Sequence, residues 1–145
     1  MAFNKARNFY NQIFGYSDAL ISPALFAVRA YIAWVFFKSG LTKIRDWEST
    51  LMLFEYEYQV PVFSPELAAW LATAGELILP VLLVVGLLTR VSAIGIFIIN
   101  YVAVISLLDI APAAFSQHIL WGSLIASLML LGGGKFSADK YLQIK

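Results

Sequence analysis

Apolar residues in this chain fall into four long runs that are separated by short polar stretches. The runs cover about residues 21–41, 67–88, 91–108 and 115–132. Each run can supply the roughly 18 to 22 residues that cross a ~30 Å hydrocarbon layer as an α-helix. Because lipid offers no hydrogen-bond partner to an open backbone, the pattern predicts an all-α bundle of four transmembrane helices.

Residues at the ends of these runs also favour helices. Ser64 can cap the second helix, with Pro65 at its first position. Only Thr89 and Arg90 separate the second run from the third, so these two helices are expected to form a tight antiparallel hairpin. The glycines of residues 132–134 are expected to end the fourth helix.

The segment between the first two runs has a helical repeat of its own. Trp47, Leu51, Phe54 and Tyr58 recur with a spacing that places them on one face of a helix. A short helix with such a face is typical of a segment lying in the membrane interface, so we predict an interfacial amphipathic helix here. The alternative is a solvated connector that contains some aromatic residues. Residues 3–14 show a weaker form of the same pattern.

The composition agrees with a membrane protein. The chain has 145 residues, of which 61% are hydrophobic and 13% charged, and its mean hydropathy is +0.78. An ordinary soluble domain of this size would not carry so much apolar surface. We therefore interpret residues 1–145 as a single membrane domain in contact with lipid.

Charge and residue types exclude several functions. A net charge of +1 without basic clusters argues against nucleic-acid binding. The absence of cysteine excludes disulfides, thiol relays and cysteine-ligated metal centres. One histidine is too few for an all-histidine metal or haem site, and no nucleophilic triad or phosphate loop is recognisable. The sequence therefore predicts no metal site and assigns no catalytic residue.

The distribution of lysine and arginine predicts the orientation. With four spans, the two termini and the turn near Arg90 share one side of the membrane. That side carries Lys5, Arg7, Arg90, Lys135, Lys140 and Lys145, whereas the other carries Lys38, Lys43 and Arg45. The positive-inside rule then places both termini in the cytoplasm. The first twenty residues lack the apolar core and cleavage site of a signal peptide, so the N-terminus is expected to be retained.

Arg29 and Glu76 are the strongest candidates for a functional site, because each places a charge inside an apolar run. Such a charge costs about 2.5–3.5 kcal/mol at a helix centre, so both side chains need partners. At ~1.5 Å per residue, Arg29 lies about 12 Å and Glu76 about 18 Å from the predicted cytoplasmic side. A long arginine can span the difference, and we predict an Arg29–Glu76 ion pair.

Two more polar residues are expected to join this pair. Asn100 lies near the middle of the third run, and Lys43 follows Arg29 on one face of the first. The cluster of Arg29, Glu76, Asn100 and Lys43 could be a structural clasp that fixes helix register. It could equally line a cavity for a ligand, a quinone head group or a proton. Both hypotheses stay open at this point.

Asp109 and His118 form a second candidate pair on the outer side. They flank the short turn between the third and fourth helices. A carboxylate beside an imidazole could relay protons, because histidine titrates near neutral pH. The alternative is two interfacial polar groups that never meet.

Three stretches of the chain are similar to a known family: RAYIAWVFFKSGLTKI, FEYEYQVP and ATAGELILPVLLVVGLLTR. They resemble the DoxX family of small four-helix bacterial membrane proteins, over about residues 25–132. The family pattern has an arginine in the first span, G-x-x-K at its outer end, a glutamate in the second span and a G-L-x-T-R turn. The matching residues are Arg29, Gly40 with Lys43, Glu76, and Gly86 with Thr89 and Arg90.

The resemblance implies a multi-pass protein of the bacterial inner membrane that is associated with redox systems. Family members resemble a membrane subunit of terminal or thiosulfate:quinone oxidoreductases, and some are linked to oxidative stress defence. The resemblance therefore implies an accessory subunit or anchor for a redox partner protein, rather than a self-sufficient enzyme. A quinol-binding oxidoreductase subunit is the first alternative, and a lipid-binding, small-molecule-binding or transport module is the second. A homo-oligomer would be compatible with each of them.

Overall fold

The computed structural model describes residues 5, 9 and 17–144, and the regular elements in this part of the chain are helices. The amphipathic pattern expected over residues 3–14 lies almost entirely outside the described residues. The helices, in order, are α2 (Ser17–Arg45), α3 (Trp47–Tyr56), α4 (Pro65–Val85), α5 (Thr89–Ser106), α6 (Pro112–Leu131) and α7 (Ala138–Tyr141).

The prediction of an all-α fold with four spans is confirmed. In the described chain α2, α4, α5 and α6 are each long and apolar enough to cross a membrane. Three of them end within a few residues of the predicted runs. Helix α2 is longer than its predicted run, 21–41, at both ends. Backbone hydrogen bonds continue past the point where the side chains become polar, so hydropathy underestimates the length of this helix.

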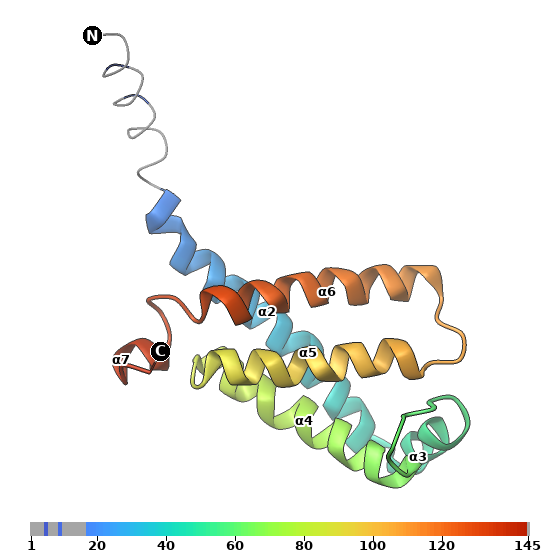
Figure 1. Cartoon of the computed structure of the whole chain (residues 1–145). Helices are drawn as coiled ribbons and strands as arrows, with labels where there is room; N and C mark the ends of the chain where they lie inside the picture. Colours follow the sequence, from blue (N-terminus) through green and yellow to red (C-terminus); the bar gives the residue numbers. More distant parts are fainter. Residues whose placement is uncertain (1–4, 6–8, 10–16, 145) are drawn as a thin grey trace.

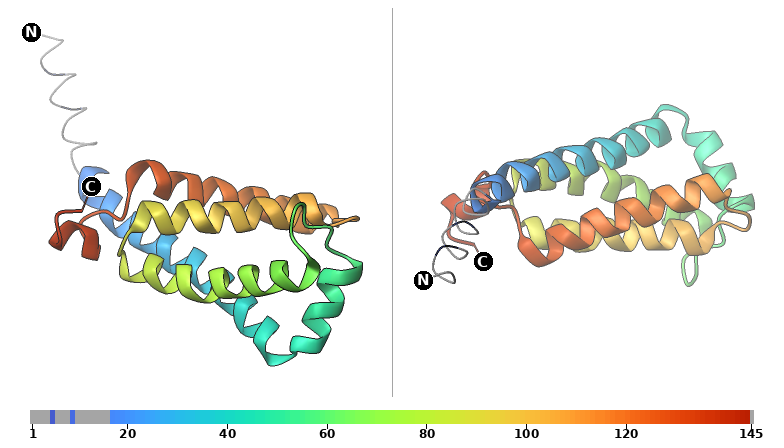
Figure 2. Two further views of the ribbon diagram at one scale, coloured as in Figure 1. Left: turned by 60° about the horizontal axis from the view of Figure 1, so that its bottom comes forward. Right: turned by 90° about the horizontal axis from the view of Figure 1, so that it is seen from above.

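Helices α4, α5 and α6 lie side by side as antiparallel neighbours, and α2 crosses them obliquely (Figures 1 and 2). The closest packing of α2 is against α4, while α5 packs against both α4 and α6. One end of the bundle holds the α4–α5 turn and the C-terminal segment. The other end holds α3 and the α5–α6 turn (Figure 1). The centre is closed by fully buried side chains, among them Ile32, Leu83, Ile96, Ile125 and Leu128.

Helix α3 occupies the segment where a short amphipathic helix was predicted. Its aromatic face packs against the beginning of α4, where Phe54 is buried on Ala68 and Ala69. The rest of that face surrounds this contact: Trp47, Leu51 and Tyr58. The predicted face therefore contacts protein, and the position of α3 relative to the membrane interface stays a prediction.

The ends of α4 follow ordinary capping chemistry. The Ser64 hydroxyl accepts a hydrogen bond from the Leu67 amide at 3.3 Å, as the sequence predicts. Gly86 ends the helix with a φ of 78°, in the left-handed region that favours glycine. A Cβ at Gly86 would also lie 2.8 Å from the Ser137 Cα and would collide with Nη1 of Arg29. The turn therefore needs glycine for its conformation and for its space.

Replacing Gly86 with alanine should destabilise the bundle. We expect Gly86→Ala to lower the free energy of unfolding by about 1–3 kcal/mol, because the left-handed conformation and the crowded backbone contact are both unfavourable. The measurement is unfolding of the purified protein in detergent micelles. Gly122→Ala is the control, because its Cβ would meet nothing closer than 3.4 Å. Equal losses in the two variants would contradict the role assigned to Gly86.

Candidate functional site

The polar residues predicted to form one cluster are divided by the structure among three places. Glu76 pairs with Lys43, Asn100 contacts His118, and Arg29 binds backbone carbonyls near the chain's C-terminus. The prediction of an Arg29–Glu76 ion pair is therefore wrong. Arg29 reaches the carbonyl of Val84, which lies about two helical turns beyond Glu76 on α4, so the two side chains lie at different depths.

Arg29 is fully buried and binds three main-chain oxygens. Its Nη1 donates to the Gly133 carbonyl at 3.0 Å, and its Nη2 donates to the carbonyls of Phe136 at 2.7 Å and Val84 at 3.4 Å. The Val84 carbonyl belongs to the last turn of α4, where carbonyls lack intrahelical partners and carry the negative end of the helix dipole. The guanidinium thus ties α2 to the end of α4 and to the C-terminal segment.

The glycines at 132–134 are the sequence signal that could have indicated this arrangement. A Cβ at Gly133 would lie 2.8 Å from Nη1 of Arg29 and 2.7 Å from Oγ1 of Thr89. Only a glycine lets the backbone approach the buried guanidinium so closely. The acceptors themselves are main-chain carbonyls, which every residue possesses, so residue types could not identify them.

The Lys43–Glu76 pair joins α2 to α4. Lys43 Nζ donates to Oε2 of Glu76 at 2.6 Å and to Oγ of Ser39 at 2.9 Å. The two charged side chains are only 15% and 8% exposed. Gly40 allows the approach, because a Cβ there would lie 3.1 Å from the Cβ of Glu76 and 3.0 Å from the side chain of Leu77. A charge pair this deeply buried is held in place by close helix packing.

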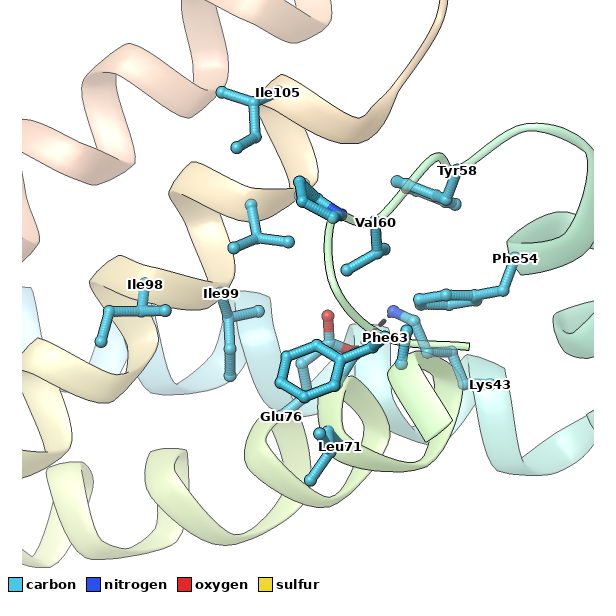
Figure 3. Close-up of a pocket in the computed structure, with 15 residues that line it drawn as sticks. Lys43, Phe54, Tyr58, Val60, Phe63, Leu71, Glu76, Ile98, Ile99 and Ile105 are labelled. Carbon is cyan, nitrogen blue, oxygen red and sulfur yellow. Dashed lines mark hydrogen bonds and ion pairs between the residues drawn. The ribbon is translucent and has the colours of Figure 1, made fainter. Parts of the chain in front are cut away.

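A cavity of about 370 Å³ opens beside the Lys43–Glu76 pair. We call it the ion-pair pocket. Apart from the pair, its walls are mainly apolar side chains of α4, α5 and the loop 57–64. Figure 3 shows these residues around the Glu76 carboxylate, including Phe63, Leu71, Ile98, Ile99 and Ile105. The arrangement places one anion and one cation at the edge of an apolar space.

Tyr58 adds a third polar group to the ion-pair pocket. Burial, together with the nearby carboxylates of Glu76 and Glu57, raises the pKa of Tyr58 above its ordinary value. Its hydroxyl therefore stays protonated at neutral pH and can donate a hydrogen bond. The aromatic spacing of α3 pointed to Tyr58, but only as part of an apolar face.

The loop after α3 forms one wall of the ion-pair pocket. The Gln59 amide donates to the Ser106 carbonyl at 2.8 Å, and Tyr58 forms an isolated antiparallel bridge with Leu107. These bonds attach the loop to the end of α5. Val62, at the tip of the loop, is 97% exposed and has a φ of 74°. Nothing in the local sequence predicts this attachment, because its partners are almost fifty residues away.

Asn100 and His118 form a two-point contact between α5 and α6. Oδ1 of Asn100 lies 2.8 Å from Nδ1 of His118, and Nδ2 of Asn100 donates to the His118 carbonyl at 3.1 Å. The exposed Asp109 has no hydrogen bond or ion pair with His118 in the described chain. The structure therefore does not bring together the predicted Asp109–His118 pair, and the imidazole contacts Asn100 instead.

Comparisons with known proteins match most of the length of this chain. A family model described as DoxX matches residues 24–109, more than half of the chain. An uncharacterized protein of Haemophilus influenzae is 30% identical over 129 residues, covering 83% of each chain. No solved structure matches the chain. The matched family region includes the whole ion-pair pocket, and it ends before α6 and the C-terminal segment that binds Arg29.

A double-mutant cycle can identify the partner of Glu76. Replacing only Lys43 (Lys43→Met) or only Glu76 (Glu76→Leu) leaves a buried charge unpaired, whereas replacing both does not. We expect the double variant to lose about 1–3 kcal/mol less of its free energy of unfolding than the two single variants lose when their losses are added. Unfolding in mixed micelles measures the coupling. The same cycle with Arg29→Met and Glu76→Leu should be additive, and strong coupling there would restore the original ion-pair prediction.

Removing the Arg29 guanidinium should release the C-terminal segment. Arg29→Met leaves the buried carbonyl of Gly133 without its donor, at a cost of about 1–3 kcal/mol for each such group. We expect faster hydrogen exchange and protease cleavage over residues 132–144, with α4 and α5 still protected at their centres. Arg45→Gln, which removes an exposed arginine at the other end of the bundle, serves as the control. Unchanged exchange in Arg29→Met would contradict the proposed anchoring.

Proposed function

This chain belongs to the DoxX family of integral membrane proteins, and we propose that it is a membrane subunit of a redox system that binds a quinol-class molecule in the ion-pair pocket. The observation that carries the proposal is the Lys43–Glu76 pair at the edge of an otherwise apolar cavity. The redox association that the family resemblance implies supports the choice of ligand.

The pocket has the size and chemistry of a site for an amphiphilic small molecule. Its volume of about 370 Å³ falls within the ~300–1,000 Å³ range of ligand sites, which are mostly apolar with a few polar groups that orient the ligand. The apolar wall suits a ring and an attached hydrocarbon tail. Lys43 and Tyr58 can donate to a ring oxygen, and the Glu76 carboxylate can accept a hydroxyl proton. These complementary roles favour a quinol over an ordinary acyl chain.

The chemistry also explains why the chain would act as a subunit. Oxidation of a quinol to a quinone releases two electrons and two protons. Glu76 can accept one of the protons and the other passes to water at the mouth of the pocket, but a chain without cysteine has no thiol that could take the electrons. The electrons must therefore pass to a redox partner protein or to a cofactor that it carries. We expect that partner to dock near α3 and the exposed loop tip at Val62, close to the pocket.

We propose that the protein resides in a bacterial inner membrane with its C-terminus in the cytoplasm. The exposed cations Arg90, Lys135 and Lys140 gather at the end of the bundle that holds the C-terminal segment. The opposite end carries the exposed Lys38 and Arg45, and its Lys43 is paired. The positive-inside rule supports this orientation, which would place the ion-pair pocket toward the outer side.

Quinone retention tests the proposed function. The protein is purified from native membranes in a mild detergent, and bound quinone is quantified by mass spectrometry. Ala103→Phe should remove the bound quinone because its ring fills the pocket. Glu76→Gln should lower retention by about tenfold, the loss expected for one charge-assisted hydrogen bond.

Ala27→Phe is the control for Ala103→Phe, because it adds the same ring at an exposed position of α2. It should retain as much quinone as the unmodified protein. Equal retention by the two phenylalanine variants would contradict the proposal. So would the absence of quinone from monodisperse unmodified protein to which quinone has been added in excess.

A further inference from the structure

A second cavity, of about 310 Å³, lies at the opposite end of the bundle from α3. The C-terminal segment after α6 folds back beside the beginning of α5 and encloses it (Figure 1, where α7 marks the segment). We call it the basic cavity. It shares no lining residue with the ion-pair pocket. Its walls come from residues 88–91, 132–135 and the segment around α7.

Three cations line the basic cavity: Arg90, Lys135 and Lys140. All three residues are exposed. Nη2 of Arg90 donates to the Leu130 carbonyl at 3.2 Å, which leaves other guanidinium N–H groups of Arg90 available. Neither lysine amino group has a hydrogen bond or ion pair with another described residue. The cavity therefore presents a concentrated positive charge.

Asp139, the carboxylate among the described residues that line the cavity, is directed at backbone amides and not at the three cations. Its Oδ1 accepts from the Leu88 amide at 2.6 Å and its Oδ2 from the Thr89 amide at 2.8 Å. Asp139 thus satisfies the first amides of α5 and balances the positive end of that helix. Both carboxylate oxygens are directed at the backbone, and the three cationic side chains form no ion pair with another described residue.

Thr89 supplies an independent indication of a ligand. The residue lines the cavity and is fully buried, and its Oγ1 is a buried atom without a hydrogen-bond partner among the described residues. Buried hydroxyls are normally paired. This one lies against the Gly133 backbone, where a Cβ would be 2.7 Å away. A hydroxyl donor beside several cations is the arrangement that binds the oxygens of a phosphate.

We propose that the basic cavity binds a phosphate group, supplied by the head group of an anionic phospholipid. Exposed apolar side chains border it: Leu88, Val91 and Leu131. These residues begin and end membrane-spanning helices, so the cavity lies where head groups meet acyl chains. Basic pockets between helices at this level are suited to anionic lipids. A free phosphate would use the same cations and leave the apolar border unused.

Lipid retention in nanodiscs and by native mass spectrometry tests this site. The unmodified protein should retain phosphatidylglycerol in preference to phosphatidylcholine. The double variant Arg90→Gln/Lys140→Gln should bind phosphatidylglycerol about 10- to 30-fold more weakly, as expected for the loss of two basic side chains. The control Lys38→Gln/Arg45→Gln removes the same charge from exposed residues at the other end of the bundle. Equal retention by both double variants would overturn the proposal.

Thr89→Val provides a test that does not depend on net charge. In neutral detergent this variant should unfold at a higher temperature than the unmodified protein, because it removes a buried unpaired hydroxyl. Phosphatidylglycerol should then raise the unfolding temperature of Thr89→Val by less than that of the unmodified protein. Equal stabilisation of the two proteins would overturn the role of the hydroxyl and the site built around it.

Inorganic phosphate distinguishes the two sources of the ligand. It is added to delipidated protein in neutral detergent, and unfolding is followed as before. If phosphatidylglycerol stabilises the unmodified protein and inorganic phosphate does not, the occupant is a lipid head group, as proposed. If inorganic phosphate stabilises it as strongly, and Arg90→Gln/Lys140→Gln abolishes the effect, a soluble phosphate is the ligand and the lipid assignment is overturned.

Discussion

A buried guanidinium that lipid cannot solvate is the constraint on which the rest of this structure depends. Arg29 lies in the interior of α2, and the acceptors of its two terminal nitrogens lie inside the protein. It finds them at the last turn of α4 and in the segment after α6, so one side chain joins three parts of the chain that are far apart in sequence. The close approach in turn requires glycine at 86 and 133. Helix crossing, turn geometry and the folded-back C-terminal segment are consequences of satisfying that charge.

The same requirement divides the polar chemistry of the bundle between its two ends. Arg29 binds carbonyls, and Glu76 pairs with Lys43, which lies about four helical turns beyond Arg29 on α2, toward α3. That pair then stands beside an apolar pocket near the loop after α3. At the opposite end, Asp139 accepts hydrogen bonds from the Leu88 and Thr89 amides at the start of α5, and the surrounding lysines and arginine form no ion pair within the described part of the chain. One end is therefore suited to a neutral amphiphile and the other to an anion.

The two sites also differ in how the family match covers them. The matched residues 24–109 contain every residue of the ion-pair pocket. The basic cavity needs the C-terminal segment, which lies beyond the match. The proposed quinol site is therefore built from the part of the chain that defines the family. The proposed phosphate site combines the α4–α5 turn with residues that lie beyond the family match. The two sites share no lining residue, so a substitution in one site changes no side chain of the other.

Hydropathy and capping residues determined the four spans, the short helix after the first span, and the beginning of α4, because these depend on neighbouring residues along one helix. The face shared by Gly40 and Lys43 was also readable from helical periodicity. Partner choice was not, since counting residues from the predicted end of a run fixes neither the relative depth of two helices nor their crossing angle and rotation. Arg29 therefore bound carbonyls, Asn100 bound His118 and Asp109 stayed exposed. Main-chain acceptors and long-range loop contacts have no residue signature, and only the tertiary structure could decide them.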